Sequence, residues 1–238
     1  MSVDQNQKLR GYRRPFWNTQ PEYLFAPYGS TLRRGITQAP IALPASLSEV
    51  TGPRPTLTLG ASAADLTAGH KGEPLGERII VSGRVIDENA RPLRNSLVEV
   101  WQCNAAGRYQ HKKDQHDAPL DPNFTGVGQV LTDDDGRYRF KTIRPGAYPW
   151  RNHYNAWRPA HIHFSLFGEG FAQRLITQMY FPGDPLLEVD PIFNCVPDAH
   201  ARQRMVSRFD WENCASEYAL AYRFDIVLRG RHESVWEN

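Results

Sequence analysis

Two histidines, His161 and His163, are the residues of this sequence best suited to bind a metal ion. They lie in the segment 157–167, where polar and apolar side chains alternate from His161 onward. Because successive side chains of a strand point to opposite sides, both imidazoles fall on one face and the apolar side chains on the other. Two such imidazoles can bind one ion; alternatively, both histidines line a polar strand face. Pro159 restricts how the chain enters this strand.

Two tyrosines, Tyr109 and Tyr148, lie where predicted strands end in loops. Buried tyrosines that cap a sandwich are the structural alternative for either one considered alone. Two histidines and two tyrosines together indicate a narrower chemistry. Phenolate is a hard, anionic donor that stabilises a trivalent ion, whereas zinc sites use mainly Cys, His and carboxylate. Ferric iron is therefore the candidate metal.

The elements that must position these residues are short β-rich runs separated by turn residues. We predict strands at residues 78–87, 96–102, 128–132, 137–143, 161–167, 175–181 and 222–228. The turn Asp133-Asp134-Asp135-Gly136 predicts a hairpin between the third and fourth of these strands. With no βαβ alternation, the sequence predicts an all-β fold, an antiparallel β-sandwich with one or two short helices.

The helices are expected in two places. Asp198 is a plausible N-cap for an amphipathic helix over residues 199–209, whose apolar spacing is carried by Met205, Val206 and Phe209. Residues 45–50 are long enough for a short turn of helix.

Residues 1–75 form a separate part of the chain in this interpretation. Prolines break most helical windows there, and the segment is too long for an ordinary loop. Its aromatic side chains favour an extended arm that wraps its own domain or a partner, because disordered tails are poor in aromatics. We therefore predict an N-terminal arm with subunit contacts over 1–75 and a catalytic β-sandwich domain with the metal site over 76–238.

Composition excludes several classes of function. The formal net charge of +2 on 238 residues is too small to argue for nucleic-acid or membrane binding. The three cysteines, Cys103, Cys195 and Cys214, are odd in number and lack metal-type spacing, which fits a reducing compartment. No apolar run approaches the length of a membrane span, and the N-terminus is not a signal peptide. We expect a soluble, cytoplasmic protein.

Several segments carry a resemblance to a known family, the intradiol ring-cleaving dioxygenases. The matching segments are residues 97–109, 121–124, 146–152, 157–164 and 222–230. The likeness runs from about Tyr28 to the C-terminus and is weakest over 1–27 and 187–221. It is strongest to the branch of iron-bearing β subunits of protocatechuate 3,4-dioxygenases. Ala147 stands where the family pattern has Pro.

The resemblance implies a mononuclear non-haem Fe(III) with Tyr109, Tyr148, His161 and His163 as ligands, and a solvent hydroxide in the fifth position. It implies that Tyr148 leaves the iron when a catechol chelates it, and that His161 lies opposite Tyr148. A catechol must lose two protons to chelate, and the departing phenolate and the hydroxide can each take one.

Further residues receive roles from the same resemblance. Arg158 cannot lose its charge and would stabilise negative charge that develops on the ring; the alternative is a structural salt bridge. Trp150 and Gln178 would support the ligands from a second layer. Tyr28 and Ile192 would form pocket walls.

The implied activity is cleavage of protocatechuate (3,4-dihydroxybenzoate) by O2 to 3-carboxy-cis,cis-muconate, a step of aromatic catabolism in the β-ketoadipate pathway. The implied partner is a homologous α subunit that lacks the metal and contributes to the substrate pocket of a hetero-oligomer. One rival is a catechol or hydroxyquinol 1,2-dioxygenase, although those enzymes begin with a helical dimerisation domain that this sequence does not predict. Another is a metal-free, non-catalytic subunit, against which the presence of all four ligands argues.

Overall fold

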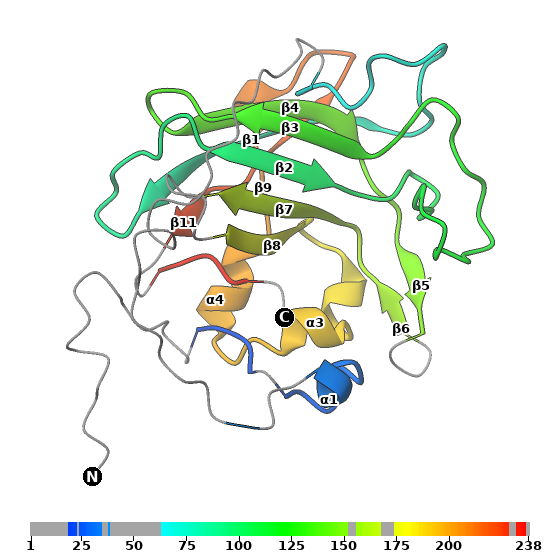
Figure 1. Ribbon diagram of the computed structural model, residues 1–238. Helices are drawn as coiled ribbons and strands as arrows, with labels where there is room; N and C mark the ends of the chain where they lie inside the picture. The colour runs from blue at the N-terminus through cyan, green and yellow to red at the C-terminus, as the bar shows by residue number, and fades with distance from the viewer. Residues whose placement is uncertain are drawn as a thin grey trace.

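The strands of this protein form two packed sheets and a short two-stranded ribbon, as the computed structural model shows (Figure 1). The structure describes residues 19–22, 24–34, 38, 63–151, 156–167, 174–228 and 232–236. The first sheet contains β1 (Arg78–Asp87), β4 (Arg137–Ile143), β9 (Arg208–Phe209), β10 (Leu220–Arg223) and β11 (Ile226–Leu228). The second has the order β3 (Val127–Leu131), β2 (Leu97–Trp101), β7 (His161–Phe167) and β8 (Arg174–Tyr180). The ribbon pairs β5 (Tyr148–Trp150) with β6 (Ala156–Arg158).

The core lies between the two sheets. Val81 of β1 and Phe164 of β7 are fully buried there, together with the other inward-facing side chains of both sheets. Burial of one such side chain contributes about 1.5–3 kcal/mol, so this alternation fixes the register of each strand. The predicted all-β, largely antiparallel sandwich is confirmed, and the bounds of β1, β4 and β7 are those predicted. The structure adds that β1 pairs in parallel with β10 and β11.

The turn at residues 133–136 forms, but the predicted hairpin is wrong. Gly136 takes a φ of 73°, and its N–H donates to the carbonyl of Asp133 over 3.0 Å. The two flanking strands nevertheless enter different sheets: β3 pairs with β2, whereas β4 pairs with β1 along its whole length. Tyr138 and Phe140 thereby pack across the core on the ring of Phe164. Burial of these rings between the layers decides the pairing, which local turn chemistry does not encode.

The predicted helix over residues 199–209 is shorter than expected. α4 (Ala199–Arg204) begins after Asp198, whose side chain accepts from the N–H of Ala201 over 2.8 Å, as predicted for an N-cap. The helix ends at Arg204, and Phe209 instead pairs with Tyr222 at the edge of the first sheet. Phe209, which the helical periodicity assigns to the helix, thus belongs to the edge of the first sheet.

The predicted strand 222–228 is two strands, β10 and β11. The strand is interrupted at Phe224, whose N–H donates to the Ser82 carbonyl and whose carbonyl accepts from the Tyr138 hydroxyl. Gly83 makes this approach possible, because a Cβ at that position would collide with the Phe224 carbonyl.

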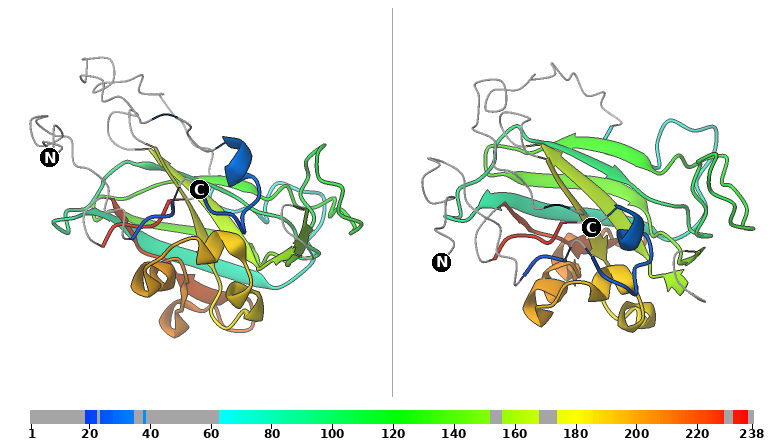
Figure 2. Two further views of the ribbon diagram at one scale, coloured as in Figure 1. Left: turned by 90° about the horizontal axis from the view of Figure 1, so that it is seen from below. Right: turned by 60° about the horizontal axis from the view of Figure 1, so that its bottom comes forward.

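Short helices lie beside β8, the edge strand of the second sheet (Figure 1). α1 (Thr31–Arg34), α3 (Pro191–Asn194) and α4 gather on the side of β8, as two further views confirm (Figure 2). Two 3-10 helices, η2 (Pro185–Glu188) and η3 (Trp211–Asn213), complete the connections. Tyr180, Phe193 and Met205 form a second apolar cluster where these helices meet β8. In β7, His161–Leu166 are all buried, so its polar face is buried as well as its apolar face.

Two sequence predictions fall largely outside the residues that the structure describes. The short helix at 45–50 lies there entirely, and so does most of the arm over 1–75. Within the described ranges, no helix combines the length and apolar character needed to cross a membrane.

Candidate metal centre

His161 and His163 lie side by side on the buried polar face of β7. Their ring centroids are 4.8 Å apart. His163 pairs with Trp101 of β2 and Gln178 of β8, and its ring stacks on the Trp101 indole at 4.8 Å. The Trp101 indole therefore packs against the imidazole from the β2 side.

The protonation of His161 suits a metal ligand. Its Nδ1 lies 2.6 Å from the Pro159 carbonyl oxygen. Because a carbonyl can only accept, Nδ1 carries the proton and Nε2 keeps its lone pair. Burial, followed by the nearby Arg158 charge and His163, holds the pKa of His161 well below its ordinary value. The neutral imidazole therefore presents Nε2 to a ligand.

The two tyrosines converge on these imidazoles from separate loops. Tyr148 Oη lies 3.3 Å from His161 Nε2. The Tyr109 and Tyr148 rings meet edge to face at 5.4 Å, and the Tyr109 ring is 6.5 Å from that of His163. The four predicted ligands thus form one group, although only His161 and His163 are close in the sequence.

The buried hydroxyl of Tyr109 suggests that a cation binds at this place. Its hydroxyl oxygen is buried, and among the described residues the Tyr148 phenol is the one side chain that interacts with it as a hydrogen-bond partner, without a well-formed bond. Burial and the adjacent Tyr148 phenol raise the pKa of Tyr109 well above its ordinary value in the absence of a counter-ion. A buried polar group without a well-formed hydrogen bond is costly and rare in proteins. A metal bound to this oxygen would stabilise its anionic form.

The donor set fits a hard trivalent ion. Among the described residues, no group of three or more His, Cys, Asp and Glu is placed to hold a metal. A metal at this place therefore needs the phenols as well as the two imidazoles. Two anionic phenolates with two neutral imidazoles suit Fe(III) rather than Zn(II).

A backbone clasp sets the distance between the two tyrosine loops. The Asn104 carbonyl accepts from the N–H of Gly107 and from the N–H of Gly146, each over 3.0 Å. Gly107 has a φ of +78°, and a Cβ there would collide with the Ala147 carbonyl and come within 3.2 Å of the Tyr148 Cβ. Only glycine allows this approach at a positive φ. Sequence reasoning identified the two tyrosines but missed Asn104 and both glycines.

Arg158 lies beside the four residues, fixed by a buried network. It pairs with Tyr148 across the β5–β6 ribbon and is 3% exposed. Its Nη2 donates to Gln178 Oε1 over 2.5 Å and to Tyr180 Oη over 3.1 Å. Its Nε forms an ion pair with Asp190 Oδ1 at 3.0 Å. The salt bridge considered as an alternative from the sequence is therefore present.

Asp190 and Tyr180 were not predicted from the sequence. Asp190 is fully buried and is the N-cap of α3, accepting from the Phe193 N–H over 3.2 Å. Burial raises the pKa of Asp190, and the Arg158 charge opposes that rise. The sequence Asp190-Pro191 is a recognisable helix start, but no local pattern shows that this cap faces an arginine 32 positions earlier.

The predicted pocket-wall residues lie at the same end of the sheet. Tyr28 is 6% exposed, and its ring meets the Trp150 ring edge-on at 5.0 Å. The Trp150 ring in turn lies 5.4 Å from the Arg158 guanidinium carbon. Ile192 is buried in α3, two residues after Asp190. Tyr28 and Trp150 thus join the group by direct contact, and Ile192 is connected to it through α3.

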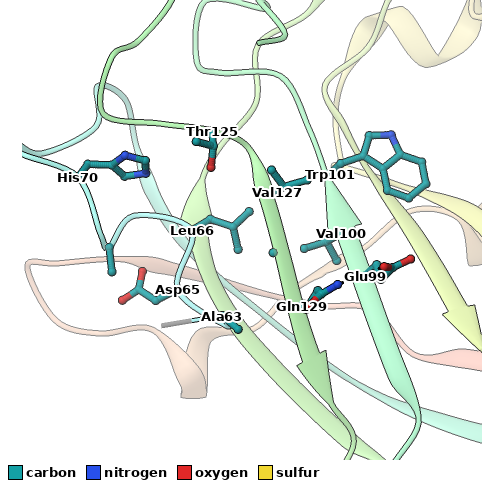
Figure 3. Close-up of a pocket in the computed structure, with 12 residues that line it drawn as sticks. Ala63, Asp65, Leu66, His70, Glu99, Val100, Trp101, Thr125, Val127 and Gln129 are labelled. Atoms are coloured by element: carbon teal, nitrogen blue, oxygen red, sulfur yellow. Dashed lines mark hydrogen bonds between the residues drawn. The ribbon is translucent and has the colours of Figure 1, made fainter. Parts of the chain in front are cut away.

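A groove of about 430 Å³ borders the candidate centre without containing it (Figure 3). It lies between residues 63–70 and the strands β2 and β3, and Asp65, His70 and Glu99 are among its lining residues. Trp101 is shared: it lines the groove, and its indole stacks on His163. In this view the indole extends to the far side of β2 from Asp65. None of the four predicted ligands lines the groove.

Comparison with known proteins shows the family to which this chain belongs. A family model described as "Dioxygenase" matches residues 50–230. The solved 3-chlorocatechol 1,2-dioxygenase of Rhodococcus opacus 1CP has the same fold, with a TM-score of 0.55 at 23% identity over 75% of this chain and 70% of that chain. The chain belongs to the intradiol dioxygenase family.

The similarity narrows to one branch of this family. A family model described as "Protocatechuate 3,4-dioxygenase beta subunit N terminal" matches residues 12–46. The chain is 58% identical to the protocatechuate 3,4-dioxygenase beta chain of Burkholderia cepacia, over 93% of this chain and 95% of that one. It is 31% identical to the alpha chain of Pseudomonas putida, over 68% and 76% of the two chains. The resemblance to the β-subunit branch is confirmed.

Proposed function

We propose that this chain is the iron-bearing subunit of an enzyme that cleaves protocatechuate by O2 between its two hydroxyl-bearing carbons, giving 3-carboxy-cis,cis-muconate. The 58% identity to a protocatechuate 3,4-dioxygenase beta chain supports the substrate and the reaction. The observation that carries the metal assignment is the buried Tyr109 hydroxyl, which among the described residues makes no well-formed hydrogen bond and whose ring lies 5.4 Å from that of Tyr148 and 6.5 Å from that of His163.

The proposed Fe(III) ligands are Tyr109, Tyr148, His161 and His163. When bound, the ferric ion supplies a Lewis acid that draws electron density from the catecholate and makes the ring reactive toward O2. Both tyrosines have anchored backbones: the Tyr109 N–H donates to Asp114 over 2.7 Å, and Tyr148 pairs with Arg158 in the β5–β6 ribbon. By the family resemblance, Tyr148 is the phenolate that would leave and take a proton from a catechol hydroxyl.

The surrounding residues have separate proposed roles. Arg158 keeps its positive charge and stabilises negative charge that develops on the substrate ring. Gln178 Nε2 is a buried donor with no partner in the described part of the chain, and it would donate to an oxygen of the bound ligand. Trp150 orients Arg158 through its ring face, and Tyr28 and Ile192 exclude water as pocket walls.

A homologous α subunit is the proposed partner. Similarity to both a beta and an alpha chain supports an α-β hetero-oligomer in which the α subunit completes the site for the substrate carboxylate. The arm over residues 1–75, as a part distinct from the catalytic domain over 76–238, is proposed to contact that partner. The proposal places the assembly in the cytoplasm, within aromatic catabolism by the β-ketoadipate pathway.

The test is turnover by the chain co-expressed with its α subunit. O2 uptake and product formation are measured with protocatechuate, catechol and hydroxyquinol. A site that binds the carboxylate should favour protocatechuate over catechol in kcat/KM by at least about 100-fold. Equal or faster turnover of catechol would support the 1,2-dioxygenase alternative. An iron-loaded assembly that turns over none of the three would support a non-catalytic subunit.

A further inference from the structure

We propose that Asp190 is a positioning residue for Arg158, and that with Tyr180 it holds the guanidinium in the one orientation that faces the reacting ring. This inference rests on the proposed function, because it concerns how the charge of Arg158 is aimed. It assigns a role in the reaction to an aspartate that no sequence pattern identified.

The geometry of the guanidinium supports the proposal. Asp190 Oδ1 contacts Nε at 3.0 Å, while Nη2 donates to Gln178 at 2.5 Å and to Tyr180 at 3.1 Å. The face of the group is covered by the Trp150 ring. The Nε contact is an ion pair without hydrogen-bond geometry, so it restrains the position of the guanidinium, while the two Nη2 hydrogen bonds and the Trp150 ring restrain its plane.

The partners of Arg158 are themselves fixed. Tyr180 Oη accepts from Arg158, so its single hydrogen goes to Gln178 Oε1 at 2.7 Å or to Asp190 Oδ2 at 3.2 Å. Asp190 Oδ2 also accepts from the Phe193 N–H at the start of α3. The Tyr180 ring packs edge-on against Phe193 at 5.3 Å. The carboxylate is therefore tied to a helix and cannot follow a moving guanidinium.

The position of this network indicates more than stability. Arg158 lies opposite Tyr148 in the ribbon, and Gln178 lies opposite His163 in the sheet. An arginine has many rotamers, and a displacement of about 1 Å at a reacting centre can cost about 100-fold in rate. The network selects one rotamer at the place where that selection affects the chemistry.

The test compares Asp190→Asn with a matched control, Asp198→Asn, in the iron-loaded assembly. Both aspartates cap short helices by accepting from the N–H three residues later, and asparagine retains a cap. Only Asp190 contacts Arg158. Asp190→Asn should lower kcat about 10- to 100-fold while the iron content and the resting charge-transfer band stay unchanged. Asp198→Asn should leave kcat unchanged.

A double-mutant cycle separates positioning from a general structural effect. If Asp190 acts through Arg158, Asp190→Asn should add little to the loss already caused by Arg158→Lys. Tyr180→Phe removes only a hydroxyl and should lower kcat several-fold with the same non-additivity, and it serves if Asp190→Asn fails to fold. Multiplied losses, or an unchanged kcat for Asp190→Asn, would overturn the proposal.

A crystal structure of the Asp190→Asn assembly gives a readout that does not depend on activity. It should show the Arg158 side chain displaced or in several rotamers. An Arg158 that keeps the wild-type rotamer would refute the positioning role even if the enzyme were impaired. Failure of the proposed function would appear differently, as a wild-type assembly that does not cleave protocatechuate.

Discussion

Substitution of Gly107 by alanine should separate the two tyrosine loops and weaken iron binding. Gly107 has a φ of +78°, and a Cβ there would collide with the Ala147 carbonyl and approach Tyr148. Gly69 provides the matched control, since it has a φ of +82° and no atom lies within 4 Å of the place that an alanine methyl would take. Both substitutions introduce the same backbone strain, and only Gly107→Ala adds a collision.

The expected losses of stability follow from the backbone strain and the collision. A non-glycine residue in the left-handed region costs about 1–2 kcal/mol, so Gly69→Ala should destabilise the protein by about that amount. Overpacking adds about 1–3 kcal/mol, so Gly107→Ala should cost about 2–5 kcal/mol in total. To relieve the collision, the loops must separate by on the order of 1 Å, which should lower iron affinity about 10- to 100-fold.

Two assays measure these effects. Urea unfolding of the metal-free assembly, compared between each variant and the wild type, reports stability. Titration with ferric iron, followed by the tyrosinate charge-transfer band, reports affinity. If Gly107→Ala loses no more stability than Gly69→Ala and binds iron as tightly as the wild type, the clasp does not set the geometry of the centre.

Three further predictions concern separate parts of the molecule. Tyr148→Phe should abolish turnover and alter the visible spectrum. Tyr138→Phe removes a hydroxyl that donates to the Phe224 carbonyl, and it should lower the stability by about 1–3 kcal/mol without changing the spectrum. Equal spectra for the two variants would contradict the ligand assignment. Burial opposes ionisation of Asp65, but the Lys141 ion pair at 2.6 Å and the Thr67 hydrogen bonds outweigh it and lower the pKa of Asp65. Ionised Asp65 therefore contributes stability above about pH 3.8, and this contribution is lost as the pH falls below that value. In urea unfolding, the wild type should be more stable than Asp65→Asn by at most about 1 kcal/mol at pH 7, and the difference should shrink between pH 4 and 3. A difference in stability that does not change with pH would count against the Asp65–Lys141 ion pair. Burial raises the pKa of Cys103 to about 12, so its thiol should resist iodoacetamide at pH 8 in the native protein, as mass spectrometry of its peptide would show; rapid labelling would mean that the loop opens.

The parts of the fold that local patterns encode were predictable. The alternation from His161 onward fixed the bounds of β7 and showed which face carries the imidazoles. Asp198 marked the start of α4, and residues 133–136 marked a turn. In each case the physical cause lies within a few residues of the sequence.

The parts that depend on distant contacts were not predictable. Whether β4 pairs with β3 or β1 is decided by packing across the core on Phe164, and the end of α4 is decided by a sheet edge that takes Phe209. The ion pair of Arg158 with Asp190 likewise joins residues with no common pattern. The candidate ligands were found because their residue types are unusual together, whereas the clasp at Asn104 uses backbone groups that any residue has.

The most direct test of the central claim is the visible absorption spectrum of the purified α-β assembly, recorded alone and then with protocatechuate in the absence of oxygen. Tyrosinate bound to ferric iron gives a charge-transfer colour. The proposed centre predicts a red-brown protein with one iron per β chain, whose band shifts when the substrate chelates and Tyr148 leaves. A colourless protein with stoichiometric zinc, or a coloured one whose band does not respond to protocatechuate, would contradict the account.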